Sequence, residues 1–258
     1  SVDWAQTYET LSKALKNGDV LGFGQKSFVS FYKAFVEGDR WKLYLRGIGV
    51  TLELTVAALI IGVVLGVLVA VVRTAHDQQR PGRRNPLLGV VNVLCQVYTT
   101  VIRGTPMMVQ LLIWGFVIFK TSRNHTLVGI IGLGINSGAY VAEIVRGGLM
   151  SVDVGQSEAG RSLGLGYLDT MRFIVIPQAF KNILPSLGNE LITLFKDTSL
   201  VSAIGGTELV YYAEAVGAKT YEYMFPYVGI ALMYLVVVMI LTALQGKLER
   251  RLRQSDRR

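Results

Sequence analysis

The stretch Glu158-Ala159-Gly160-Arg161-Ser162-Leu163-Gly164, continuing to Ile174-Val175-Ile176-Pro177, is a polar segment between two apolar ones, and the rest of the chain is organised around it. Helix-forming residues precede glycines at positions 164 and 166, and a run with apolar periodicity follows from Tyr167 to Phe180. Because glycine ends helices and permits turns, this order predicts a short helix, a turn and a second helix. A membrane protein commonly uses such a long, ordered connection to contact a partner.

Composition places the chain in a bilayer. Of its 258 residues, 51% are hydrophobic and 17% are charged, and the mean hydropathy is +0.43. This is more apolar surface than one soluble domain of this size can bury. The net charge of +8 does not indicate a nucleic-acid partner, because six basic residues lie within 247–258, directly after an apolar segment. A cytoplasmic positive flank explains them more simply.

Several classes of chemistry are disfavoured by the residues that the sequence lacks. The single cysteine, Cys95, lies in an apolar run, and the only histidines, His76 and His125, are far apart, so we expect no disulfide framework and no metal site. The phosphate-binding pattern G-x-x-x-x-G-K-[ST] does not occur. We therefore expect no cofactor in this chain, and any ATP to be bound with Mg²⁺ by a separate subunit.

Hydrophobicity predicts an all-α membrane protein with five spans, at 47–72, 87–119, 127–148, 183–205 and 227–245. The first contains one ionisable residue, Glu53, and a Gly62-x-x-x-Gly66 face suited to close helix packing. The second is too long for one straight crossing and is interrupted by Arg103-Gly104-Thr105-Pro106. Proline removes a helical donor, so we predict a broken helix whose irregular segment is covered by protein or lines a cavity.

Three parts are expected along the chain. Residues 1–46 form an N-terminal extracytoplasmic or interfacial segment, in which Phe28, Phe31, Tyr32 and Phe35 recur at helical spacing. An interfacial helix and a helix packed against the protein's own spans fit this pattern equally well. Residues 47–245 form the transmembrane domain, with a docking loop at about 149–182, and residues 246–258 form a basic cytoplasmic tail.

Polar residues inside the spans indicate a binding site. Ser186, Glu190, Thr193 and Asp197 share one helical face, which is a candidate hydrophilic lining. Asn136 and Ser137 lie in the middle of the third span, where they can hydrogen-bond either a neighbouring helix or a substrate. From a rise of about 1.5 Å per residue, Glu190 lies roughly 10 Å and Asn136 roughly 17 Å from the cytoplasmic side, so both can border one pocket. Lys196 points off this face, toward an acid on a neighbouring helix or toward the outer surface.

Charge also predicts the orientation. The connections at 73–86 and 146–182, together with the tail, hold 14 Lys and Arg residues, against 3 in the other two loops. The positive-inside rule then places the N-terminus outside and the C-terminus in the cytoplasm. The N-terminal stretch adds seven basic residues to the outer side and contradicts this assignment in part.

The polar segment resembles the EAA loop of bacterial ABC importer permeases, the loop that docks on the ATPase. Glu158, Ala159, Gly164, Ile174 and Pro177 fall at the matching spacing. Gly160 stands where the family has alanine, which is expected to loosen the short helix by about 1 kcal/mol. Ile176 stands where the family has leucine. The resemblance implies a coupling role for the loop residues Glu158, Ala159, Gly160, Gly164, Leu165 and Gly166.

Three further stretches are similar to permeases for polar amino acids, in the family's order. They are Arg103-Gly104-Thr105-Pro106-Met107-Met108-Val109-Gln110, the Asn136-Ser137-Gly138-Ala139-Tyr140 stretch with Ala142-Glu143-Ile144-Val145-Arg146-Gly147-Gly148, and Gly188-Asn189-Glu190 with Lys196-Asp197-Thr198-Ser199-Leu200. The resemblance covers roughly 47–245. It implies substrate contacts for Asn136, and the candidate substrate-binding residues are Asn136, Ser137, Glu190, Thr193, Asp197 and Thr105.

The resemblance implies a type I ABC importer permease, a multi-pass protein of the bacterial inner membrane that is not itself an enzyme. The implied partners are a pair of ATP-binding subunits, a second permease copy in a homodimer or related heterodimer, and an extracytoplasmic amino-acid-binding protein, besides membrane lipid. An ion-coupled carrier or channel that uses Glu190, Lys196 and Asp197 is the alternative. An intramembrane enzyme is a third class, for which the sequence offers no clustered catalytic residues.

Overall fold

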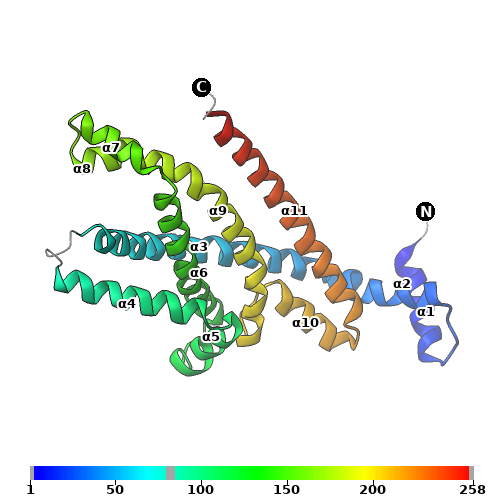
Figure 1. Ribbon diagram of the computed structural model, residues 1–258. Helices are drawn as coiled ribbons and strands as arrows, with labels where there is room; N and C mark the ends of the chain where they lie inside the picture. The colour runs from blue at the N-terminus through cyan, green and yellow to red at the C-terminus, as the bar shows by residue number, and fades with distance from the viewer. Residues whose placement is uncertain (1–2, 80–84, 256–258) are drawn as a thin grey trace. The chain divides into compact units, whose positions relative to one another are not determined.

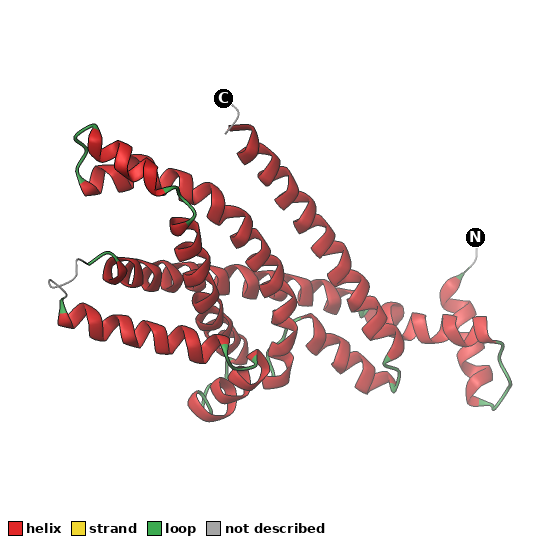
Figure 2. Ribbon diagram, in the orientation of Figure 1, coloured by secondary structure: helices red, strands yellow, loops and turns green. Residues whose placement is uncertain are grey.

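The computed structural model describes residues 3–79 and 85–255, and every regular element within these ranges is helical (Figures 1 and 2). Contacts divide the chain into two compact units. The first comprises the residues up to Thr51 together with Thr207–Val237, and the second comprises Leu52–Gly206 and the residues from Val238. Two long helices, α3 (Trp41–Asp77) and α11 (Met224–Ser255), contribute to both units.

The first unit contains the N-terminal helices. Its other elements are α1 (Trp4–Lys16), α2 (Phe23–Phe31), a π-helical turn (Tyr32–Val36), a 3-10 turn (Glu37–Asp39) and α10 (Leu209–Thr220). The aromatic run is helical, as its spacing predicted. The rings of Tyr8 and Tyr32 stack at 4.3 Å, and those of Trp4 and Phe28 lie 5.8 Å apart, so α1 packs on α2. Phe23 remains 86% exposed at the beginning of α2.

The second unit contains the quoted motifs. Its elements are α4 (Pro86–Arg103), α5 (Met107–Ile113), a π-helical turn (Trp114–Ile118), α6 (His125–Met150), α7 (Val154–Ser162), α8 (Tyr167–Thr170), a second π-helical turn (Met171–Val175), α9 (Ile176–Asp197) and a 3-10 helix (Thr198–Ile204). The break predicted in the second span is confirmed, because α4 ends at Arg103 and α5 begins at Met107. The predicted short helix, turn and second helix of the polar segment are α7, the Gly164 turn and the helical run from α8 into α9.

Glycines allow α6 to pack closely against two other helices. A Cβ at Gly66 of α3 would lie 2.6 Å from Val141 of α6, and one at Gly148 of α6 would lie 2.3 Å from Ile183 of α9. Such distances leave no room for a side chain, so glycine lets the backbones approach. The close-packing roles predicted for the GxxxG face of α3 and the glycine-rich span are confirmed.

Among the described residues, four helices are long and apolar enough to cross a membrane: α3, α4, α6 and α11 up to Leu252. Helix α9 matches the remaining predicted span but carries more polar residues. The helix extends beyond the predicted span of 183–205 at its beginning, at Ile176, and the span's last part, from Thr198, is a 3-10 helix. At 22 residues it extends about 33 Å, which is enough for a crossing.

Two other boundaries differ from the predicted ones. The segment at 206–226 is not only a loop, because it contains α10. The basic tail begins as a continuation of α11, which extends helically to Ser255 beyond the predicted end at 245. A span predicted from hydropathy ends where charged residues begin, whereas the helix continues because charged residues also form its backbone hydrogen bonds.

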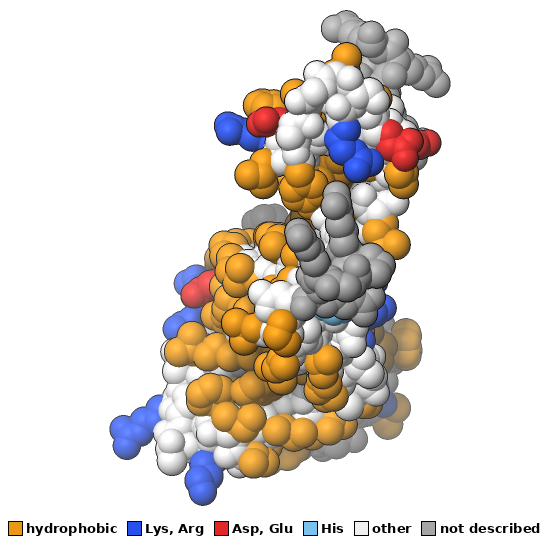
Figure 3. Space-filling view, turned by 60° about the vertical axis from the view of Figure 1, so that its left-hand side comes forward, with side chains coloured by type: hydrophobic (Ala, Val, Ile, Leu, Met, Phe, Trp, Pro, Cys, Tyr) orange, Lys and Arg blue, Asp and Glu red, His pale blue; other side chains and the backbone are white. Residues whose placement is uncertain are grey.

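The outer face of α4 is apolar. Leu87, Val90, Leu94, Val97 and Val101 recur every three or four residues and are 53–71% exposed. Hydrophobic side chains also cover much of the face drawn in Figure 3. An exposed apolar face along a membrane-length helix is a surface that lipid or another membrane helix covers.

Candidate functional site

The break between α4 and α5 is stabilised by side-chain hydrogen bonds. Carbonyl groups at the end of α4 lack helical donors, because Pro106 has no N–H. Thr105 Oγ1 donates to the carbonyl oxygen of Val101 at 2.8 Å, and Gln110 Nε2 donates to that of Ile102 at 2.7 Å. The irregular segment therefore keeps its polar backbone groups paired, as membrane depth requires.

Gln110 also joins this break to α6. Its Nε2 donates to Thr105 Oγ1 at 2.7 Å, and its Oε1 accepts a hydrogen bond from Asn136 Nδ2 at 3.0 Å. Gln110 is 6% exposed and Asn136 is 8% exposed, so water does not compete strongly for these bonds. From the sequence, Gln110 was part of a family motif, and no role was predicted for it. Its position, as a single polar residue in an apolar run four residues after Pro106, could have indicated that its side chain bonds the broken backbone.

Ser137 faces a different helix from Asn136. Its Oγ donates to Glu190 Oε1 of α9 at 2.7 Å, and it is fully buried. Successive helical residues point about 100° apart, so the two neighbours contact different partners. The predicted set therefore forms two clusters, Thr105 with Gln110 and Asn136, and Ser137 with Glu190, on different sides of α6.

The rest of the predicted α9 stripe is more accessible. Thr193 is exposed and Asp197, at the last residue of α9, is half-buried. Lys196 is exposed. The four predicted residues all lie within helix α9, as their spacing required, but Glu190 is the one that accepts a hydrogen bond from α6. Thr193 and Asp197 remain candidates.

Gln245 of α11 is a second polar contact that the sequence did not single out. Its Nε2 donates to Asn189 Oδ1 at 2.9 Å and to the carbonyl oxygen of Pro185 at 3.2 Å, both on α9. A Cβ at Gly188 would lie 3.0 Å from Gln245 Cγ, so glycine there makes room for this side chain. The contact fastens the C-terminal part of α11 beside the α9 segment that carries Glu190.

Gly160 allows α7 to pack on the following turn. A Cβ at this position would lie 2.8 Å from Ile174 Cδ1 and 3.2 Å from Thr170 Cγ2. The expectation that glycine here only loosens the helix was incomplete, because its missing side chain also permits this contact. Gly164 ends the turn with a φ of +83°, a backbone conformation that favours glycine.

The docking loop exposes apolar side chains beside its polar ones. Leu163 is 83% exposed, Leu168 is 78% exposed and Val154 is 70% exposed, while Glu158 and Ala159 are also exposed. Large apolar residues on an exposed segment are typical of a surface that contacts another protein or the membrane.

Polar contacts tie the same loop to the helix ends. Tyr167 OH donates to Gln78 Oε1 of the segment after α3, and Asn182 Nδ2 donates to Ser151 Oγ after α6. These two contacts link the segment to the end of α3 and link the end of α6 to α9.

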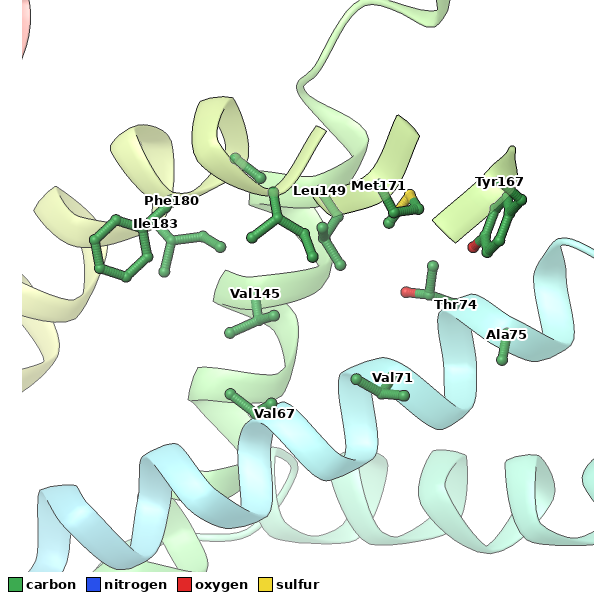
Figure 4. Close-up of a pocket in the computed structure, with 12 residues that line it drawn as sticks. Val67, Val71, Thr74, Ala75, Val145, Leu149, Tyr167, Met171, Phe180 and Ile183 are labelled. Atoms are coloured by element: carbon green, nitrogen blue, oxygen red, sulfur yellow. The ribbon is translucent and has the colours of Figure 1, made fainter. Parts of the chain in front are cut away.

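An apolar cavity of about 400 Å³ lies next to this loop (Figure 4). Val67 and Val71 of α3 face Val145 of α6 and Ile183 of α9 across it, and Tyr167 and Thr74 lie near its end. Such a lining offers few partners for a polar solute. We therefore do not place the substrate there.

Glu208 is a buried acid in the first unit, in the connection between the predicted spans 183–205 and 227–245. Its carboxylate caps α10 by accepting from the N–H groups of Val210 and Tyr211 at 2.9 and 3.0 Å, and it accepts from Tyr234 OH at 3.1 Å. Burial raises the pKa of Glu208 to about 7, although these three hydrogen bonds oppose the rise. The residue is a structural cap rather than a surface charge.

Comparison with known proteins agrees with this architecture. Residues 86–254 match the family described as "Binding-protein-dependent transport system inner membrane component". The chain is 36% identical over 215 residues to the arginine transport system permease protein ArtQ of Bacillus subtilis strain 168, with 82% of this chain and 93% of ArtQ covered. It is 34% identical over 211 residues to the putative glutamine transport system permease protein GlnP of Rickettsia typhi, with 81% and 92% covered.

Solved structures show the same fold. A crystal structure of an amino acid ABC transporter with histidines matches with a TM-score of 0.73 and 40% identity, over 81% of this chain and 94% of that one. The methionine ABC transporter MetNI in an inward-facing conformation matches with a TM-score of 0.67 at 19% identity, over 82% and 97% of the two chains, and supports the fold alone.

Fold and motifs together define an all-helical, multi-pass permease of the type I ABC importer class. The chain belongs to the family of inner-membrane components of binding-protein-dependent transport systems. It is a transport subunit, and in this family ATP hydrolysis is carried out by a separate subunit.

Proposed function

We propose that this permease imports polar amino acids. The curated relatives named above serve arginine and glutamine transport, and a third, the L-cystine transport system permease protein TcyB of Bacillus subtilis, is 34% identical over 220 residues. The polar clusters inside the helix bundle supply groups that suit a small zwitterion: amides at Gln110 and Asn136, and a carboxylate at Glu190. These relatives differ in substrate, so the proposal covers the class and not one amino acid.

The proposed mechanism is alternating access driven from the docking loop. Closure of two ATPase subunits around Mg-ATP would move paired α7–α8 segments, and the contacts at Tyr167 and Asn182 would transmit that movement to α3, α6 and α9. Helices packed as tightly as α6 and α9 at Gly148 move as rigid bodies rather than bending. The exposed apolar residues of the docking loop are the observation that carries this proposal.

The partners follow from the same mechanism. A pair of ATP-binding subunits would bind the docking loop, and an extracytoplasmic binding protein would deliver the amino acid on the opposite side. The membrane helices of one chain are too few to surround a complete path for the substrate. A second permease copy, identical or related, would complete that path. This arrangement requires the docking loop and the end of α11 to lie in the cytoplasm, as the basic residues predict.

The direct test is uptake by the reconstituted complex. The permease, its ATPase and its binding protein are placed in sealed vesicles, and radiolabelled arginine, glutamine, histidine and cystine are offered outside. Uptake of at least one is expected only when Mg-ATP is present on the ATPase side. Uptake driven by an ion gradient without the ATPase would instead support the ion-coupled carrier and would overturn the proposal.

A further inference from the structure

Besides the apolar cavity, a polar cavity lies between α3, α4 and α6 in the second unit. It has a volume of about 540 Å³, and its lining consists of Arg73, Gln96, Thr99, Thr100, Arg103, Gly104 and Glu143. None of these residues belongs to the candidate set derived from the sequence. Its volume lies in the range of small-molecule sites, and its lining is polar although all three helices are membrane-length.

The α4 wall of this cavity belongs to a polar stripe. Asn92, Gln96, Thr99 and Arg103 follow one another at intervals of three or four residues, on a different face from the apolar series that begins at Leu87. Asn92 is 3% exposed, and its Oδ1 has no hydrogen-bond donor within the described ranges. Asn92 and Thr99 are buried, whereas Gln96 and Arg103 are exposed. Polar and charged residues within membrane spans are costly and commonly line substrate pathways.

The charges of the cavity are unbalanced. Arg73 forms an ion pair with Glu143 of α6, and the two side chains are 13% and 30% exposed. Arg103 has its guanidinium 5.4 Å from the ring centre of Tyr140, and it forms no ion pair with a carboxylate of residues 3–79 or 85–255. Two cations and one anion leave a net positive charge, which favours a ligand with one negative group.

The two arginines approach the cavity from opposite helix ends. Helices α3 and α4 run antiparallel, with Arg73 near the end of one and Arg103 at the end of the other (Figure 1). Helical side chains lean toward the N-terminus of their own helix. Both guanidinium groups therefore reach back toward the middle of the helix pair, where a ligand can bind between them. Arg103 is exposed, so a ligand can reach it from outside the protein.

The cavity adjoins the network around the helix break. Arg103 precedes Thr105 by two residues, and Tyr140, which its guanidinium covers, lies one helical turn from Asn136. We infer that this cavity is a subsite for the α-carboxylate of the transported amino acid, with Arg103 as the residue that binds it. This inference rests on the proposed function. It names the site that would bind the α-carboxylate, the group that all amino-acid substrates share. An arginine guanidinium can bind a carboxylate through two parallel hydrogen bonds, a geometry that lysine cannot reproduce.

The test compares an amino acid with its α-carboxamide, which keeps the side chain and amino group but lacks the negative charge. The permease–ATPase complex in phosphatidylcholine nanodiscs is titrated with the amino acid that the wild-type complex transports, and then with that carboxamide. Wild type is expected to bind the acid at least about tenfold more tightly. Arg103→Gln should weaken binding of the acid about tenfold and remove the difference in affinity between acid and carboxamide. Arg103→Lys should retain part of that difference.

Arg123→Gln is the matched control, because Arg123 is an exposed arginine outside the cavity. It should bind both compounds as wild type does. Equal affinity of wild type for acid and carboxamide, or unchanged affinity in Arg103→Gln, would overturn the inference. So would an affinity for the acid that phosphatidylglycerol lowers in wild type but not in Arg103→Gln, with the two proteins equal in phosphatidylcholine, since Arg103 would then hold a lipid phosphate. If the wild-type complex transports none of the amino acids offered, the proposed function itself fails, which is a separate outcome.

Discussion

Gln110 connects the helix break to α6 through its side-chain amide. Gln110→Leu would leave the Ile102 carbonyl and the Asn136 amide without partners in a buried environment. Each such loss costs about 1–3 kcal/mol, so a lower thermal midpoint of the purified complex and impaired uptake are expected. Gln6→Leu, at an exposed position of α1, serves as the control. A variant with the wild-type midpoint and uptake would contradict this role.

Glu208 predicts how stability depends on pH. Its pKa of about 7 in the fold exceeds the value of 4.5 for a free side chain, so the folded state binds the proton more tightly. Stabilisation from this group is complete below about pH 4.5 and is lost as pH rises through 7, by an amount on the order of 3 kcal/mol.

Glu208→Gln removes this ionisation. Between pH 5 and pH 8, the thermal midpoint of wild type should therefore fall relative to that of the variant. Glu9→Gln, which changes an exposed acid of α1 in the same unit, should follow wild type. Parallel curves for wild type and Glu208→Gln would show that the buried acid does not titrate in this range.

Glu190 is the acid that the structure connects to Ser137. If it contacts substrate, Glu190→Ala should reduce uptake to background while the permease still assembles with its ATPase, since the residue lies away from the docking loop. Co-purification of the ATPase and labelled amino-acid uptake measure the two properties separately. Wild-type uptake in this variant would remove Glu190 from the site.

At the scale of elements, the turn after α7 depends on one backbone conformation. Gly164 has a φ of +83° and open space around its Cα, so Gly164→Val would be strained by about 1–2 kcal/mol through the backbone alone. We expect ATP hydrolysis to continue but uptake to fall, because the turn no longer presents α7 correctly. The measurement is the ratio of transported amino acid to ATP hydrolysed.

Gly147→Val is the control for this turn. Gly147 also has open space around it but lies in a regular helix, where valine is tolerated at small cost. If both variants keep the wild-type ratio, the turn does not transmit ATPase movement.

At the scale of the whole molecule, the predicted orientation separates the docking loop from the segment that contains α10. In a Cys95→Ser background, a cysteine at Leu163, which is 83% exposed, should react with an impermeant maleimide only from the cytoplasmic side. A cysteine at Lys219, also exposed, should react only from the outside. Labelling of Leu163→Cys from outside intact cells would exclude docking on a cytoplasmic ATPase.

Much of the architecture was predictable because it depends on local pattern. Pro106 marked the break between α4 and α5, since it lacks an N–H whatever surrounds it. The glycines around Gly66 and within α6 marked close packing. The ends of α9 and α11 were less predictable, because hydropathy reports the surroundings of side chains and not where backbone hydrogen bonds stop.

The candidate site was predictable only in part. Asn136, Ser137 and Glu190 stood out as polar residues in apolar segments, but their sequence positions do not state which neighbour each one contacts. Adjacent residues of α6 point in different directions, so the structure separates Asn136, bonded to Gln110, from Ser137, bonded to Glu190. Gln245 and Arg73 were missed because their partners lie far away in the chain.

The sequence by itself determined that this chain spans a membrane, breaks its second span at Pro106 and carries a polar segment in which a short helix is followed by a glycine turn. Each of these follows from residue type and local spacing. Only the tertiary structure decided that Gln110 joins the break to α6, that Gln245 fastens α11 to α9, and that two arginines face one polar cavity. Hydrogen bonds and charges between distant segments act through space, and their pairing depends on how the helices pack.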